Sequence, residues 1–322
     1  MPGFARPTLV ASRCLGFAAC RWDGEIVRSE AVQKLLPHVR FITHCPEEEI
    51  GLGTPRRPIR VIEENGEQRL YQPDTGLDFT APMREWSRKI LAGLPPVEGF
   101  VLKSRSPSCG LADVKLHRGK AGDGPTRRTA GFFGGEVLER YGDLAVEDEG
   151  RLTNFVVRER FLIRVFTLAE FRETRRAGDP GRLVAFQARH KLLFMACHQT
   201  AMRALGRIVA NHERLPFAEV AARYEETLLK LLRGGPKTGN TVNVLMHALG
   251  YFKKTLRAGE KGFFLDLLEA YRNGQTPLSA PVSVLRSWIE RTDEDYLRRQ
   301  SFFEPYPRDL LDLGDSGRGR DY

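Results

Sequence analysis

Short apolar runs of strand length alternate with helical patterns over the first half of the chain. Three such runs end in Gly, Pro or a loop: residues 7–13, 39–44 and 99–103. Two stretches between them have apolar residues at helical spacing: residues 29–36 and 78–92. Residues 60–71 carry Asn65-Gly66, a strong hairpin signal. This alternation predicts an α/β domain with a Rossmann-like open parallel sheet.

From about Leu152 the apolar positions keep helical spacing throughout. Helices are expected at residues 155–169, 183–210, 217–232, 240–256, 261–271 and 282–289. Gly, Pro and Asn residues mark the breaks between them. We therefore predict two domains, an α/β domain over residues 1–152 and a separate all-α helical domain over residues 153–322.

Composition places the chain among globular proteins of the cytoplasm. It has 322 residues, of which 41% are hydrophobic and 28% charged, enough for two cores. No apolar run approaches the roughly 20 residues that span a bilayer, and the N-terminus lacks a signal-peptide pattern. Five cysteines are too few, and an odd number, for a secreted disulfide framework. In a reducing compartment they favour metal binding or catalysis.

The positive charge is unevenly distributed. Residues 1–150 contain 21 Lys and Arg against 21 Asp and Glu, whereas residues 151–322 contain 29 against 20. The whole excess therefore lies in the second half, which favours a polyanion as its partner. A solvated helical surface is the alternative.

Three cysteines come directly after predicted strands: Cys14, Cys45 and Cys109. Loops after the carboxyl ends of parallel strands converge on one crevice, so these thiols should meet in space. None has the paired Cys-x-x-Cys hook of a structural zinc site, although zinc stays possible. Three thiolates from three loops suit an iron–sulfur cluster with one open iron. We interpret Cys20 as packing beside the site, with a fourth ligand as the alternative, and Cys197 as core.

The residues around these cysteines form three motifs in order. They read Ser12-Arg-Cys-Leu-Gly16 with Cys20-Arg-Trp-Asp-Gly24, then Cys45-Pro-Glu47 with Pro55-Arg56, then Ser106-Pro-Ser-Cys-Gly110. Over residues 7–150 the chain resembles the TudS-like (YbbK-type) thiouracil desulfidases. The second half is similar to the YbgA-like helical domain, on the stretches 188–193, 243–254 and 277–281. Together they resemble a thiouridine desulfidase of the RudS type.

The resemblance implies a 4Fe-4S cluster held by Cys14, Cys45 and Cys109, with one open iron. The implied reaction converts 4-thiouridine to uridine without redox chemistry. Glu47 is our candidate for the base that activates water, and Ser106 for orienting water or substrate. The expected substrate contacts are Ser12, Arg13 and Ser108. Arg13 stands where smaller residues are usual in the family.

The basic half is expected to bind the substrate when it is carried in tRNA, with thiouridine monophosphate as the alternative substrate. Candidate RNA contacts are Arg189, Lys191, Lys237, Lys253 and Lys254. A base in tRNA must leave its stack to reach a buried iron. A non-enzymatic iron–sulfur or zinc regulator that binds RNA remains the alternative function.

Two glycine pairs are weaker signals. Gly51-Leu-Gly53, beside Arg56 and Arg57, and Gly134-Gly135 could contact a phosphate through backbone N–H groups. Neither has Rossmann or P-loop spacing.

Overall fold

A computed structural model describes residues 3–120 and 123–312 of the chain. The chain divides into two compact units, Met1–Ala169 with Pro307–Tyr322, and Glu170–Tyr306. The division falls inside helix α5 (Phe155–Ala177). The domain boundary predicted between residues 152 and 153 comes just before this helix, and it stays a prediction.

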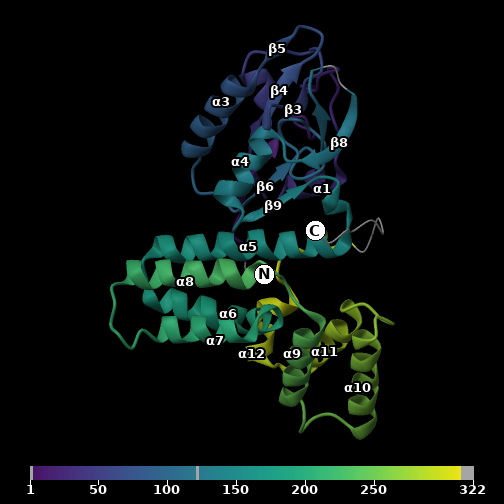
Figure 1. The fold of residues 1–322 in the computed structure, drawn as a ribbon. Helices are drawn as coiled ribbons and strands as arrows, with labels where there is room; N and C mark the ends of the chain where they lie inside the picture. The colour runs from purple at the N-terminus through teal and green to yellow at the C-terminus, as the bar shows by residue number, and fades with distance from the viewer. Residues whose placement is uncertain (1–2, 121–122, 313–322) are drawn as a thin grey trace. The chain divides into compact units, whose positions relative to one another are not determined.

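The first unit contains a four-stranded parallel sheet, sheet A, with the strand order β2-β1-β6-β9 (Figure 1). Its strands are β1 (Thr8–Ser12), β2 (Arg40–His44), β6 (Gly99–Leu102) and β9 (Ala145–Asp148). The central strands β1 and β6 are buried along their whole length, so both faces need apolar residues. The predicted α/β class with an open parallel sheet is confirmed.

A second, five-stranded sheet, sheet B, has the order β5-β4-β3-β7-β8 and mixes parallel with antiparallel pairs. Its strands are β3 (Arg60–Glu64), β4 (Glu67–Gln72), β5 (Leu77–Asp78), β7 (Val114–Arg118) and β8 (Asp123–Thr129). The predicted hairpin joins β3 to β4 through Asn65 and Gly66, which both have positive φ angles. The sequence pattern did not predict β7 and β8, because β7 has only Val114 and Leu116 as apolar positions and β8 has no apolar position.

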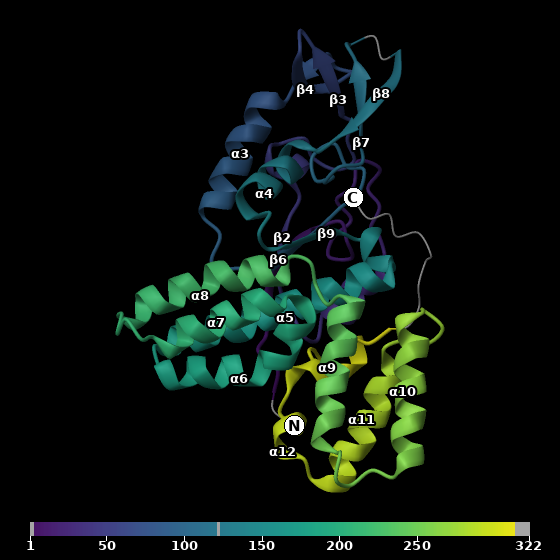
Figure 2. The ribbon, with the colours of Figure 1, turned by 60° about the horizontal axis from the view of Figure 1, so that its bottom comes forward.

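Helices cover both sheets of the first unit. They are α1 (Glu30–Leu35), α2 (Pro46–Glu49), α3 (Thr80–Ala92) and α4 (Phe132–Tyr141), with the 3-10 turns η1 (Arg151–Thr153) and η3 (Arg308–Leu310). Helices α3 and α4 pack together (Figures 1 and 2). Met83 of α3 belongs to the core of sheet B, with Val61 and Leu116. Phe133 of α4 packs into the core of sheet A, with Phe100.

The second unit is helical in its described residues, as predicted. Its helices are the end of α5, α6 (Pro180–Cys197), α7 (Gln199–Ala210), α8 (Phe217–Leu232), α9 (Thr238–Tyr251), α10 (Ala258–Arg272), α11 (Ser279–Thr292) and α12 (Asp295–Arg298), with η2 (Ser301–Phe303). Cys197 is 1% exposed, which agrees with a core position. Of all the helices described in the chain, none has the length and apolarity to cross a membrane.

Helix α4 approaches the Cys109 loop more closely than a side chain would permit. A Cβ atom built on Gly134 would lie 2.3 Å from the carbonyl oxygen of Gly110 and 2.7 Å from that of Cys109. On Gly135 the nearest atom would be the Cβ of Ala130, at an ordinary 3.6 Å. The glycine at 134 thus permits close packing of backbone on backbone, so its predicted role in phosphate binding is not needed to explain it.

We expect Gly134→Ala to lower the free energy of unfolding by about 1–3 kcal/mol, because the added methyl group overpacks against fixed backbone. Gly135→Ala is the matched control one residue along the same helix. It should be neutral or stabilising by up to about 1 kcal/mol, because Ala is the better helix former. Urea unfolding of both variants measures the difference, and equal stabilities would contradict the packing role of Gly134.

Candidate functional site

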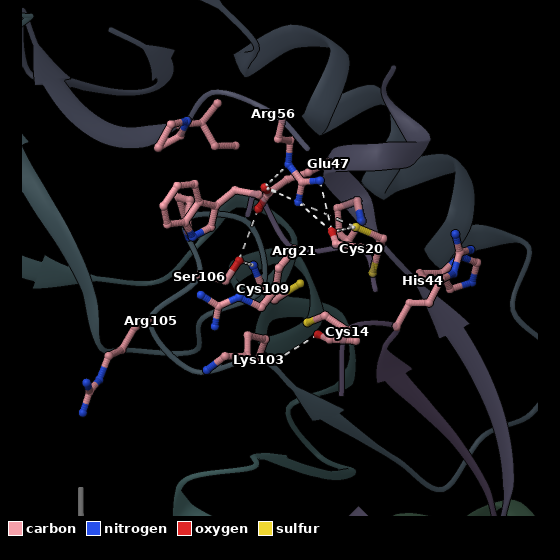
Figure 3. A pocket seen from close by; sticks show the side chains of 18 of the residues that line it. Cys14, Cys20, Arg21, His44, Glu47, Arg56, Lys103, Arg105, Ser106 and Cys109 are labelled. Carbon is pink, nitrogen blue, oxygen red and sulfur yellow. Dashed lines mark hydrogen bonds and ion pairs between the residues drawn. The ribbon is translucent and has the colours of Figure 1, made fainter. Parts of the chain in front are cut away.

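A cavity of about 410 Å³ opens at the carboxyl ends of strands β1, β2 and β6 (Figure 3). This is the end of a parallel sheet at which ligands bind. The loops that follow the three strands form its walls, together with residues that precede β3. Its polar and sulfur-bearing lining includes Ser12, Arg13, Cys14, Cys20, Arg21, His44, Cys45, Glu47, Arg56, Lys103, Ser104, Arg105, Ser106 and Cys109.

The structure brings the three strand-end cysteines into this one cavity. Cys14 follows β1, Cys45 follows β2 as the N-cap of α2, and Cys109 lies in the loop after β6. Cys45 and Cys109 are buried, and Cys14 is half-buried. The convergence expected from the sheet geometry is therefore present, whereas the role of these thiols as metal ligands stays a prediction.

A fourth cysteine, Cys20, joins the group from the loop between β1 and α1. Its side chain is buried, and its carbonyl oxygen accepts a hydrogen bond from the Cys45 thiol at 3.5 Å. The ligand atoms of Cys20, Cys45 and Glu48 all lie within 4.8 Å of one another. Sequence reasoning left Cys20 open between packing and a ligand, and its six-residue separation from Cys14 was the available signal.

Crowding and burial raise the pKa values of the Cys20, Cys45 and Cys109 thiols. Hydrogen bonding with Cys14, followed by smaller contributions that include burial, raises the pKa of Cys20 to about 11. Hydrogen bonding with Cys20 and burial raise the pKa of Cys45 strongly. Burial raises the pKa of Cys109 to about 12. The pocket thus disfavours thiolates unless positive charge is supplied within it.

This donor set fits an iron–sulfur cluster. Thiolates are soft ligands, and a coordinating metal ion deprotonates a thiol outright, which reverses the effect of burial. The sulfurs come from separate loops of one cavity. This arrangement suits a cluster bound from several sides better than a single metal ion bound by a Cys-x-x-Cys pair. Cys14, Cys45 and Cys109 would hold such a cluster, with Cys20 beside them.

A buried carboxylate stands at the edge of the cysteine group. Glu47 is only 9% exposed, and its Oε2 accepts a hydrogen bond from Arg56 Nε at 2.8 Å. Its Oε1 accepts one from Ser108 Oγ at 2.9 Å. The same oxygen lies 3.5 Å from Ser106 Oγ (Figure 3). Arg56 and the two serines thus fix the direction in which this carboxylate points into the cavity.

Arg56 is the residue of this site whose role sequence reasoning missed. Its side chain is 5% exposed, and its guanidinium donates to Glu47 and to the carbonyl oxygens of Cys20 and Gly53. One of its terminal nitrogens lies 4.0 Å from the Cys45 sulfur. With its donors occupied inside the protein, Arg56 is not the exposed phosphate contact considered from the sequence.

The two serines of the Cys109 loop differ in their surroundings. Ser106 lines the cavity, and its hydroxyl oxygen accepts hydrogen bonds from the backbone N–H groups of Ser108 and Cys109. Ser108 is 0% exposed, and its hydroxyl donates to Glu47. Ser106 is therefore the serine that faces the cavity, while Ser108 supports the carboxylate from behind.

Arg13 and Ser12 both line the cavity, yet their polar groups have partners within the protein. The Arg13 guanidinium forms ion pairs with Glu48 at 3.3 Å and with Glu49 at 2.7 Å. Glu49 Oε1 also accepts from the backbone N–H of Cys45, so Arg13 ties the Cys14 loop to the Cys45 helix. The Ser12 hydroxyl oxygen accepts from the backbone N–H of Lys103. These contacts hold the loops in place.

The predicted RNA contacts of the helical unit are mostly free to meet a ligand. Lys191, Lys237, Lys253 and Lys254 are exposed. Arg189, by contrast, pairs with Glu170 at 3.4 Å, beside the buried His190. Arg189 therefore has a structural partner within its own unit, and binding of RNA by all five residues stays a prediction.

Comparison with known proteins covers both parts of the chain. Residues 9–149 match the family described as 2-thiouracil desulfurase, and residues 191–307 match a family described as a protein of unknown function, DUF1722. The uncharacterized protein YbgA of Escherichia coli (strain K12) is 32% identical over 158 residues, which cover 48% of this chain and 93% of that protein. The uncharacterized protein YbbK of Bacillus subtilis (strain 168) is 34% identical over 109 residues, which cover 32% of this chain and 72% of that protein.

No solved structure was found to match the chain. The two relatives cover different parts of it, in agreement with the two family matches. The chain therefore belongs to the 2-thiouracil desulfurase family, with a second region of the YbgA-like DUF1722 family, and its membership supports a thiouracil desulfurase activity.

Proposed function

We propose that this protein is a cluster-dependent desulfidase that converts 4-thiouridine, in tRNA or as its monophosphate, to uridine. The observation that carries the proposal is the meeting of four cysteine sulfurs and one buried carboxylate in a single cavity. In the reaction, a carbon–oxygen double bond replaces the carbon–sulfur double bond of the base. Water supplies the oxygen, and hydrosulfide and a proton are released. No atom changes its oxidation state, so the reaction needs no electron donor.

Cys14, Cys45 and Cys109 would hold the cofactor. A 4Fe-4S cluster on three cysteines supplies one open iron, a Lewis acid that suits a thiocarbonyl sulfur as its soft ligand. Arg56 lies against the same sulfur group, with one nitrogen 4.0 Å from Cys45 Sγ. Its fixed positive charge would favour the anionic forms that arise in this cavity, a thiolate or a departing hydrosulfide.

Glu47 would act as the base that removes a proton from water and later returns it to the ring. Its side chain is paired with Arg56 at 2.8 Å, and a carboxylate can accept a proton from water. The hydrogen bond from Ser108 fixes one oxygen, so the carboxylate need not reorient during the reaction. Ser106, on the cavity wall, would orient the water or the base, and the cavity of about 410 Å³ has the size of a small-molecule site.

The basic helical unit would bind the tRNA that carries the thiolated base. A free base needs no basic domain, whereas tRNA is a polyanion that exposed lysines attract. Lys191, Lys237, Lys253 and Lys254 offer such contacts, and Arg189 would join them only by leaving Glu170. The thiolated base would have to turn out of its stack to enter the cavity.

Metal analysis and an activity assay test the proposal together. The full chain purified without oxygen should contain about four irons and four sulfides. It should also remove the near-ultraviolet absorbance of 4-thiouridine from thiolated tRNA. One zinc per chain in place of iron would support the zinc alternative, in which the Cys20, Cys45 and Glu48 ligand atoms hold one ion. Iron with unchanged tRNA absorbance would support the non-enzymatic regulator.

We expect Glu47→Gln to keep the cluster and lower the turnover of thiolated substrate by about 100-fold or more, because an amide cannot accept the proton from water. Glu30→Gln, on the exposed first turn of α1, is the matched control and should behave as the wild type. Iron content and the rate of absorbance loss are measured on both. Cys109→Ala should lose the cluster and the activity together, and full turnover by Glu47→Gln would exclude Glu47 as the base.

Arg56→Ala should lower the free energy of unfolding by about 3–5 kcal/mol, because it leaves the buried Glu47 carboxylate without its ion-pair partner. The neighbouring Arg57 provides the control, since its side chain is 73% exposed and lies 3.6 Å from Asp74. Arg57→Ala should change stability by less than about 1 kcal/mol. Denaturant unfolding compares the two variants, and equal losses would contradict the structural importance of the Arg56–Glu47 pair.

A further inference from the structure

The two faces of sheet B differ in chemistry. Val61 of β3 and Leu116 of β7 are paired neighbours, and both point into the core with Met83 of helix α3. Side chains alternate along a strand, so the residues before them, Arg60 and Lys115, point to the opposite face. That face lies away from α3, and Lys115 is exposed on it.

Three cations form a row across this outer face. Arg60 and Lys115 stand on the neighbouring strands β3 and β7, one residue before the Val61–Leu116 pair. Lys115 pairs directly with Arg128 of β8. Lys115 and Arg128 are exposed and Arg60 is half-buried. We call Arg60, Lys115 and Arg128 the basic row.

Among the described residues, the members of the basic row have no carboxylate partner, in contrast to three other cations on or beside the strands of sheet B. Arg127 pairs with Glu63 at 2.7 Å, Lys120 pairs with Glu64 at 3.4 Å, and Arg69 pairs with Asp78 at 3.3 Å. Within the described part of the chain, no member of the basic row lies within ion-pair distance of a carboxylate. Like charges on neighbouring strands repel one another, so a bound anion would stabilise this end of the sheet.

The pKa of the neighbouring His117 side chain is affected by the positive charge of the basic row. His117 pairs with Ile62 of β3 and shares the outer face with Lys115. Burial lowers the pKa of His117, and the positive charges of Arg60 and Lys115 lower it further. The imidazolium is therefore disfavoured beside the row, as expected where the local potential is positive.

The basic row lies at the end of sheet B that adjoins the cavity. Pro58 and Ile59 line the cavity and lead directly into Arg60, the first residue of β3. The cavity-lining Arg105 donates its backbone N–H to Asp113, which leads into β7 two residues before Lys115. The paired carboxylates Glu63 and Glu64 occupy the far end of β3. The basic row is thus at the end of sheet B that is nearer the cavity. Glu63 and Glu64, at the other end of β3, do not neutralise its charge.

We propose that the basic row binds the phosphodiester backbone of the RNA strand whose thiolated base enters the cavity. This inference rests on the proposed function, since it assumes a thiolated RNA substrate. Neighbouring strands lie about 4.8 Å apart, so the row extends over about 10 Å. That span exceeds the reach of one phosphate group and suits successive phosphates along a strand. Residues 1–150, although neutral overall, would then contact RNA in addition to the helical unit.

Equilibrium binding of 4-thiouridine-containing tRNA to the full chain, measured across a range of KCl concentrations, tests the row. The variant carries Arg60→Gln, Lys115→Gln and Arg128→Gln together. Each lost phosphate contact lowers the slope of log affinity against log salt by roughly 0.7–0.9, so the triple variant should lose roughly 2 from this slope. The control carries Lys120→Gln and Arg127→Gln, which remove two exposed cations that are ion-paired, one in the turn between β7 and β8 and one on β8, and it should keep most of the slope.

A triple variant with the wild-type slope and affinity would overturn the proposal, and so would an equal loss in the control. The charge-conserving variant Arg60→Lys, Lys115→Arg, Arg128→Lys should restore binding if phosphate contacts, rather than the fold of sheet B, are responsible. If the triple variant instead raises KM for thiouridine monophosphate as much as for tRNA, the row binds one phosphate and the assignment to an RNA backbone is wrong.

Turnover of free 4-thiouracil, the base of the proposed substrate, separates this inference from the proposed function. A free base has no phosphate, so the triple variant should turn it over at the wild-type rate while losing activity on tRNA. If the wild-type chain desulfurises neither substrate, the proposed function fails, whereas the salt dependence of tRNA binding still decides the role of the row.

Discussion

The buried ion pair between Glu47 and Arg56 is the contact on which the geometry of the site depends. Arg56 donates to Glu47 on the Cys45 helix and to the carbonyl oxygen of Cys20, and Glu47 in turn accepts from Ser108 beside Cys109. Three loops that are far apart in sequence are therefore joined through one guanidinium and one carboxylate. Removal of either charge would leave the other buried without a partner, which costs more than the pair itself contributes.

The same burial that fixes the loops raises the free energy of thiolates in the cavity. Cys45 and Cys109 lie in surroundings that raise their pKa values, and Cys20 is held close to both Cys14 and Cys45. The positive charge of Arg56, with one nitrogen 4.0 Å from Cys45 Sγ, acts in the opposite direction, but the pKa of Cys45 remains raised. In the folded chain these sulfurs are therefore favoured as neutral thiols, and only a bound metal ion or cluster of the kind proposed above would hold them as thiolates.

The positions of the site cysteines could be predicted from the sequence more completely than the strands around them. Strand ends in a parallel sheet converge, so the positions of Cys14, Cys45 and Cys109 could be predicted to meet from the apolar runs alone. Strands β7 and β8 could not, because β7 has only two apolar residues and β8 has none, too few for an apolar run of strand length. The role of Arg56 was also hidden, since the local pattern Pro55-Arg56-Arg57 does not tell which arginine turns inward; only tertiary packing separates a 5% exposed side chain from a 73% exposed one.

The net charge of a segment does not describe the local charge of each part of its surface. Residues 1–150 have equal numbers of basic and acidic residues, and for that reason the second half alone was assigned to RNA. In the folded sheet, however, Glu63 and Glu64 neutralise cations at one end, and Arg60, Lys115 and Arg128 stand together at the other. Screening limits such interactions to about 10 Å at ordinary ionic strength, so the local row, not the sum over the unit, determines what an approaching phosphate meets.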